Sequence, residues 1–137
     1  QVICELNKRS KIDAFDLLAM KFKHENINFF RQDFFQFNFK SFNKKYDLIL
    51  SDMAPNTTGH QSTDHLKISS IIQDVISVLR KISLPNSNFV FKIWKGSEEK
   101  NIIHQLKKQY KKVSYCKPRS SRDESSEIFI VAENFIV

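Results

Sequence analysis

Short apolar runs of strand length alternate along this chain with longer segments of helical periodicity. Apolar residues recur at helical spacing from Asp64 to Ile82, where Asp64 is the predicted N-cap, and again over Glu98–Tyr110. The end of a further helix is predicted at Val2–Asn7, and a turn or short helix over Leu17–His24. The predicted strands are Lys11–Phe15, Asn28–Phe30, Tyr46–Ser51, Asn88–Trp94, Val113–Cys116 and Glu127–Ala132.

The order of these elements predicts an α/β fold. After the helical stub come three strands, a helix, a strand, a second helix and two final strands. Strands that alternate with helices favour a mostly parallel sheet covered on both faces. The last two strands follow one another without a helix, so we expect them to pair antiparallel. No repeat or linker interrupts the pattern, which predicts a single domain over residues 1–137.

The composition adds a positive charge to this picture. The formal net charge is +7, which favours an anionic partner, with nucleic acid ahead of a membrane surface. No apolar run approaches the roughly 20 residues that a membrane-spanning helix needs, and the first residues lack a secretory signal. We therefore expect no membrane association.

Cysteine and histidine usage argues against a disulfide framework or a metal site. Cys4 and Cys116 are far apart and have no CxxC spacing, which favours a reducing, cytoplasmic location. His60 and His65 have no partner ligands at a suitable spacing, so no metal is expected. The chain also has only two glycines, which is few for a domain that would cradle a nucleotide.

Two carboxylates next to apolar strands are candidate functional residues. Asp52 lies in the run SDMAPN at the carboxyl end of what we expect to be a buried strand, Tyr46–Ser51, and ligands of open α/β sheets bind at that edge. A plain strand-ending turn explains the same residues. Glu127 directly precedes the apolar run 128–131, where an idle carboxylate is not expected, although the polar loop before it reads equally as solvated.

Lys92 lies inside the apolar strand Asn88–Trp94. A buried lysine costs several kcal/mol unless it is paired or neutralised. In one interpretation its head simply reaches water. In the other, burial lowers its pKa from about 10.4 and makes it a usable base.

Cations gather in the last third of the chain. Four lysines lie at and just after the end of the second predicted helix, and they form either its solvated face or phosphate contacts. The set comprises Lys107, Lys108, Lys111 and Lys112, with Lys117, Arg119 and Arg122 in the loop that follows.

Three segments combine these features in a fixed order: YDLILSDMAPNTTG at 46–59, NFVFKIW at 88–94 and KPRSSRDESSEIFIVA at 117–132. Together they resemble the FtsJ/RrmJ (RlmE) family of ribosomal RNA large-subunit methyltransferases. The resemblance runs from end to end, since IDAFDLLAM at 12–20 and FFRQDFF at 29–35 are similar to the family's segments after its second and third strands.

The resemblance implies a Rossmann-like methyltransferase sheet with strand order 3-2-1-4-5-7-6 and strand seven antiparallel. In that order Asp52 after strand four, Lys92 in strand five and Glu127 at the start of strand seven converge on one rim. Lys92 matches the family's proton acceptor for the ribose 2′-hydroxyl. Asp52 matches a residue near the methyl-bearing end of the cofactor, and Glu127 would orient Lys92 or the ribose.

The resemblance also implies a cofactor and a substrate. S-adenosylmethionine would be the methyl donor, with Asp16 at its ribose hydroxyls and Asp33 at its adenine amino group. The acceptor would be a uridine 2′-hydroxyl of large-subunit ribosomal RNA, contacted by Lys117, Arg119 and Arg122, and the protein would act as a monomer. A competing hypothesis is a non-catalytic RNA-binding remnant of such an enzyme.

The chain departs from the family pattern at its beginning and before strand five. Strand one and the glycine-rich loop are absent, because Gln1 matches the last residue of that loop, and a family lysine upstream of the loop is also missing. Residues preceding Gln1 on a parent protein would restore both. A Gly-Gly pair before strand five is replaced by Pro85–Asn88. We therefore expect an open edge on strand four and weak binding of the cofactor's methionine half.

Overall fold

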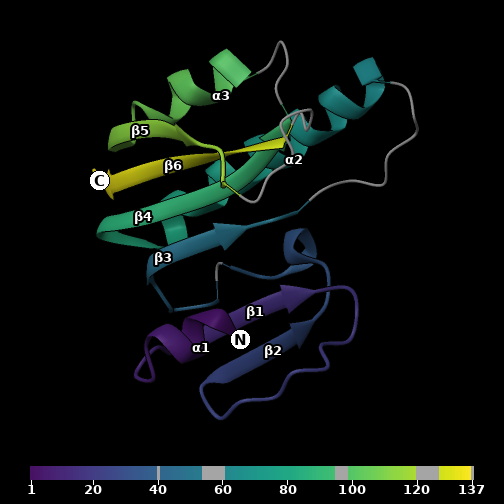
Figure 1. Cartoon of the computed structure of the whole chain (residues 1–137), viewed down its shortest axis with the longest axis vertical. Helices are drawn as coiled ribbons and strands as arrows, with labels where there is room; N and C mark the ends of the chain where they lie inside the picture. The colour runs from purple at the N-terminus through teal and green to yellow at the C-terminus, as the bar shows by residue number, and fades with distance from the viewer. Residues whose placement is uncertain (40, 54–60, 95–98, 120–126, 137) are drawn as a thin grey trace. The chain divides into compact units, whose positions relative to one another are not determined.

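The computed structural model describes residues 1–39, 41–53, 61–94, 99–119 and 127–136. The chain divides into two compact units, Gln1–Ser41 and Phe42–Val137, which we describe separately (Figure 1). The expected single domain over residues 1–137 stays a prediction. The fold is of the α/β methyltransferase type that the resemblance implies, with strands and helices close to their expected places.

The first unit is built on a parallel pair of strands. Helix α1 (Val2–Leu6) precedes β1 (Ile12–Asp16), β2 (Ile27–Arg31) and a short 3₁₀ helix (Phe34–Gln36). The two strands pair in register from Ile12 opposite Ile27 to Asp16 opposite Arg31. No helix forms over residues 17–24, where the backbone bends after β1 and is otherwise irregular, so the short helix considered there is absent.

A cluster of phenylalanine rings holds this unit together. Phe15 stacks on Phe30 with ring centroids 4.7 Å apart, and Phe34, Phe37 and Phe39 pack around the pair. Aromatic pairs of this kind contribute about 0.5–1.5 kcal/mol each beyond the area they bury. The cluster fixes the carboxyl ends of β1 and β2, where the two predicted cofactor carboxylates lie.

The second unit contains a four-stranded mixed sheet in the order β3-β4-β6-β5. The strands are β3 (Tyr46–Ser51), β4 (Ser83–Trp94), β5 (Tyr110–Cys116) and β6 (Glu127–Phe135). Strands β3 and β4 are parallel, while β6 is antiparallel to both β4 and β5. The expected antiparallel pairing of the last two strands is confirmed, and the order agrees with the expected 4-5-7-6.

Two helices cover one face of this sheet. Helix α2 (Gln61–Ile82) crosses behind the sheet in Figure 1, and α3 (Glu99–Leu106) lies beside β5. The core between them is apolar and fully buried, which is what the helical periodicity predicts. It includes Leu79, Phe89, Phe91, Ile93, Leu106, Ile128, Ile130 and Ala132.

Some predicted boundaries were wrong. Helix α2 begins at Gln61, so Asp64 lies inside its first turn and is not the N-cap. Tyr110 begins strand β5 and does not end α3, because its buried ring packs edge-on against Phe135 of β6, with centroids 5.3 Å apart. Tertiary packing here overrides a helical pattern that continues in the sequence.

Strand β3 is exposed on the face that α2 and α3 leave uncovered. Leu48 is 44% and Leu50 is 52% exposed, so the expectation of a buried strand is wrong for these residues. In the sheet that the structure describes, β3 is an edge strand with β4 on one side only. Leu50 pairs with Val90, which alternates with the buried Phe89 and Phe91, so its side chain lies on the face opposite the buried core.

Strand β4 contains an irregularity where the family resemblance places Gly-Gly. Tyr46 pairs with Ser83 but Leu48 pairs with Asn88, so β4 has extra residues opposite β3. Asn86 takes a left-handed backbone conformation there, with φ of 64°. Asparagine tolerates this conformation better than most residues, which lets it stand where glycine would be usual.

Candidate active site

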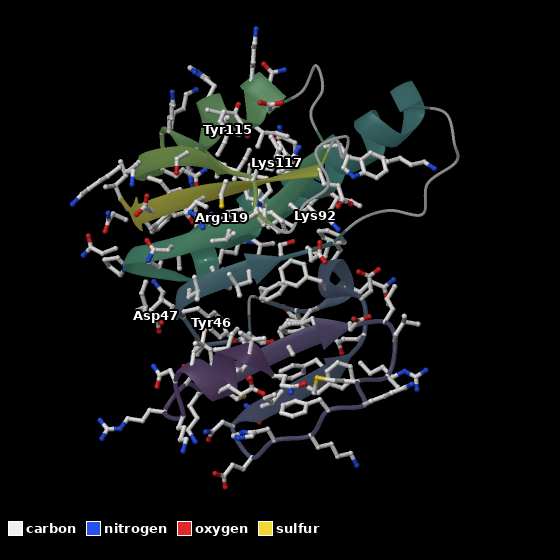
Figure 2. The ribbon with its side chains drawn as sticks, in the orientation of Figure 1. Tyr46, Asp47, Lys92, Tyr115, Lys117 and Arg119 are labelled. Carbon is white, nitrogen blue, oxygen red and sulfur yellow. The ribbon has the colours of Figure 1, made fainter. Side chains whose placement is uncertain are left out.

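Sheet pairing brings three predicted site residues to one end of the second unit. Lys92 pairs with Phe129, and two residues further along β4 Trp94 pairs with Glu127, the first residue of β6. On the other side of β4, Ser51 pairs with Phe91, so Asp52 emerges beside Lys92. Figure 2 shows Lys92 at this end of β4. The expected convergence is therefore present.

The three side chains form an ion-paired cluster. The Lys92 Nζ lies 2.6 Å from Asp52 Oδ1 and 3.5 Å from Glu127 Oε1. The lysine side chain is only 19% exposed, whereas Asp52 is 74% and Glu127 45% exposed. An ammonium is thus held inward by two carboxylates whose remaining oxygens face solvent.

The electrostatics of this cluster favour the charged lysine. The hydrogen bond from Lys92 to Asp52 is the main cause that raises the pKa of Lys92 above its ordinary value of 10.5. Burial lowers this pKa, but the charges of Asp52 and Glu127 add to the hydrogen bond and outweigh it. The interpretation in which burial alone brings the pKa down is therefore wrong for the chain without ligands.

Trp94 is a member of the site that the sequence reasoning missed. Its indole Nε1–H donates to Glu127 Oε1 at 3.5 Å, which is the oxygen that faces Lys92. Strand periodicity is the signal that identifies it, because residues two apart on a strand share a face. Trp94 is half-buried, so it is also one wall of the cluster.

The two predicted cofactor carboxylates lie in the first unit, at the carboxyl ends of its parallel strands. Asp16 Oδ1 accepts from the backbone N–H of Leu18 at 2.8 Å, and Asp33 Oδ1 accepts from that of Phe35 at 2.9 Å. These bonds fix the rotamer of each side chain and use only one oxygen of each carboxylate. The other oxygens can accept from hydroxyl or amino groups of a ligand.

The predicted RNA contacts follow β5. Lys117 and Arg119 are exposed just beyond the end of that strand (Figure 2). Arg122 lies outside the described residues. Tyr115, next to them on β5, is hydrogen-bonded to Glu99 of α3, and desolvation of its hydroxyl together with this carboxylate raises its pKa to about 12. The tyrosine therefore stays neutral at physiological pH.

The described part of the chain contains no group of three metal-ligating side chains, and His60 lies outside it. None of the described helices is long and apolar enough to cross a membrane.

The chain is similar to known methyltransferases in sequence and in fold. The FtsJ-like methyltransferase family model matches residues 1–135. Ribosomal RNA large subunit methyltransferase E of Rickettsia felis is 35% identical over 130 residues, which are 91% of this chain and 57% of that protein. A ribosomal RNA methyltransferase structure from Plasmodium falciparum is 27% identical with a TM-score of 0.84, over 98% of this chain and 79% of that one.

A more distant structure shares the fold alone. N-methyltransferase NodS from Bradyrhizobium japonicum, in complex with S-adenosyl-L-homocysteine, is 15% identical with a TM-score of 0.55, over 95% of this chain and 70% of that one. The chain spans just over half the length of the curated relatives it matches, such as those from Rickettsia felis and Rickettsia rickettsii.

Proposed function

Because the chain belongs to the FtsJ-like methyltransferase family, we propose that it carries the acid-base site of an S-adenosylmethionine-dependent RNA 2′-O-methyltransferase. The substrate is the ribose 2′-hydroxyl of a uridine in large-subunit ribosomal RNA. The matched relative is a large-subunit ribosomal RNA methyltransferase, which supports this substrate class. The two free thiols, Cys4 and Cys116, support a reducing cytoplasm as the location. The monomeric state stays a prediction.

The observation that carries this proposal is the Lys92 cluster. Desolvation of a lysine between two carboxylates at the end of a sheet costs free energy. An apolar residue would pack at this position without that cost. Perturbed ionisable groups of this kind are typical of catalytic sites. Asp52 and Glu127 fix the Nζ in place, so that it can meet a ribose hydroxyl at a defined point.

The chemistry of the carboxylates also fits the adenosine half of the cofactor. Asp16 would accept hydrogen bonds from its ribose hydroxyls, and Asp33 would accept one from its adenine amino group. Each has the free oxygen that this requires, since only Oδ1 is used by the backbone. When bound, S-adenosylmethionine supplies an electrophilic methyl group.

Lys92 accepts the 2′-hydroxyl proton only in its neutral form. Because the paired ammonium has a raised pKa, the neutral fraction at physiological pH is small in the chain without ligands. The cluster also holds the hydroxyl in line for attack, so both positioning and removal of the proton depend on Lys92. Glu127 and Asp52 orient the lysine, and Lys117, Arg119 and Arg122 bind the RNA backbone.

The test is methyl transfer by the chain with the family's strand one and glycine-rich loop fused ahead of Gln1. Labelled methyl groups should appear on ribose oxygens, which makes the RNA resistant to alkaline cleavage at that nucleotide. Lys92→Ala should abolish transfer and leave RNA binding nearly intact. Lys92→Arg should fail almost as badly, because a guanidinium cannot act as a base.

The matched control is Lys81→Ala, which removes an exposed lysine from the end of α2. It should transfer methyl groups normally. Near-normal turnover of Lys92→Arg would show that a fixed positive charge is sufficient, and the proton-acceptor role would be dropped. A fusion that binds RNA but transfers nothing would favour the non-catalytic alternative.

A further inference from the structure

The positive charge of the chain is concentrated in one continuous stretch. Residues 99–119 contain seven lysines and arginines and a single carboxylate, Glu99. Their formal charge is therefore +6, against +7 for the whole chain. This stretch forms α3, the turn after it, β5 and the exit from β5, so the charge lies along one edge of the four-stranded sheet. We call it the basic edge.

The turn at the start of the basic edge presents its cations on a fixed backbone. Leu106, Gln109 and Tyr110 are buried, whereas Lys107, Lys108, Lys111 and Lys112 are exposed. Backbone hydrogen bonds close the turn from Gln109 N to Leu106 O at 2.9 Å and tie it to β6 from Ile136 N to Gln109 O at 2.7 Å. The lysines therefore need little backbone ordering to bind a ligand.

Three of these lysines are not used within the described structure. Lys112 pairs with Glu133 at 2.6 Å, and Glu99 is engaged by Tyr115. Lys107, Lys108 and Lys111 form no ion pair with another described residue. The basic edge thus keeps three uncompensated ammonium groups at the end of β5 that is farther from Lys92.

The position of this triad relative to the site follows from strand register. Cys116 at the end of β5 pairs with Phe129, which pairs with Lys92, so Lys117 emerges near the site. Lys111 lies six residues earlier on β5. At about 3.3 Å per residue, the triad and Lys117 are roughly 20 Å apart along a straight edge.

Structural roles account for part of this charge. Lysines after a helix complement the negative end of its dipole, and lysines on an edge strand discourage pairing with other chains. A single cation serves the first role, and Lys112 on β5 already serves the second. Neither role requires Lys107, Lys108 and Lys111 to lie together.

We propose that Lys107, Lys108 and Lys111 bind the phosphate backbone of a helical RNA segment next to the target nucleotide. Three exposed cations held on one hydrogen-bonded turn and the strand after it suit a regular phosphate backbone, and proteins read helical RNA mainly through its shape and backbone. This inference rests on the proposed function only in that the partner is RNA. The triad holds the RNA helix at a distance from Lys92. The spacing between that RNA helix and the target nucleotide therefore determines which nucleotide reaches Lys92.

The test is the salt dependence of binding by the full chain to an RNA hairpin with a long stem, measured without cofactor. Replacing the triad by K107Q/K108Q/K111Q should lower the slope of log binding constant against log salt by about 2 to 3, since each phosphate contact contributes about 0.7 to 0.9. Binding to single-stranded RNA of equal length should change much less.

The control is K8Q/R9Q/K23Q, which removes three exposed cations from the first unit and leaves the same net charge. It should leave the slope on the hairpin nearly unchanged. Equal effects of the two triple variants would overturn the proposal, and so would an equal loss on single-stranded RNA or an unchanged slope. Because no methyl transfer is measured, an inactive chain still gives a clear answer. Circular dichroism checks that both variants are folded.

Discussion

Lys92 is subject to opposing influences. Burial favours its neutral form, while the hydrogen bond to Asp52 and the charge of Glu127 favour the ammonium, and the second influence is the larger. A lysine within an apolar strand can be recognised in the sequence, as can the two carboxylates beside strand ends. The direction of the pKa shift of Lys92 cannot be recognised in the sequence. It depends on the 2.6 Å contact with Asp52, which forms only when the strands pair in the folded protein.

The raised pKa of Lys92 predicts how catalysis depends on pH. If the neutral amine accepts the proton, the logarithm of the single-turnover rate of the fused enzyme should rise about one unit per pH unit from about pH 6 to 9. No plateau is expected below the ordinary value of 10.5, because the folded pKa lies above it. Asp52→Asn removes the main cause of the shift, so its plateau should begin at lower pH. A rate independent of pH would exclude a titrating base.

The indole of Trp94 is expected to act through Glu127. Trp94→Phe keeps an aromatic ring but removes the N–H that donates to Glu127 Oε1. We expect the kcat of the fused enzyme to fall several-fold, with the KM for RNA and the free energy of unfolding little changed. In a double-mutant cycle, Trp94→Phe should add nothing to Glu127→Ala. Additive losses would mean that the indole acts on something other than this carboxylate.

At the scale of elements, the strongest sequence patterns located helices and strands well but placed their ends less well. The start of β4 shows why. Its first residues include Pro85 and Asn86, which are residue types typical of turns, yet they lie within a strand that pairs irregularly with β3. Asn86 adopts the left-handed backbone conformation that such turns often contain. Strand β4 nevertheless continues through Asn86, and no local sequence pattern predicts that continuation.

The left-handed conformation of Asn86 makes a stability prediction for this irregularity. Asn86→Ala should cost about 1 kcal/mol of unfolding free energy, because a Cβ without a compensating polar group is disfavoured at φ of 64°. Asn86→Gly should be close to neutral, since relief of strain offsets greater freedom of the unfolded chain. Urea denaturation would measure both, with Asn43→Ala at an exposed position as the control. Equal costs for alanine and glycine at position 86 would contradict this account.

At the scale of the whole molecule, the strand pairing within each sheet was predictable because the family resemblance supplies an order that strand register then obeys. Burial was less predictable. The apolar run of β3 suggests a covered strand, but Leu48 and Leu50 lie on the face that the described helices do not cover. The apolar run does not report which face of the sheet the described helices cover, and that face decides which side chains of β3 are exposed.

The same reasoning predicts how the chain binds its cofactor. Asp16 and Asp33 can hold the adenosine half, whereas a chain with two glycines offers no glycine-rich loop for the methionine half. By calorimetric titration, the 137-residue chain should bind S-adenosylmethionine at least about tenfold more weakly than the fusion with strand one and the loop, a difference of about 1.4 kcal/mol.

Adenosine alone should bind the two proteins with similar affinity, because its contacts are common to both. Asp33→Asn should weaken both ligands in both proteins. Equal affinity of the two proteins for S-adenosylmethionine would show that another segment of this chain holds the methionine half.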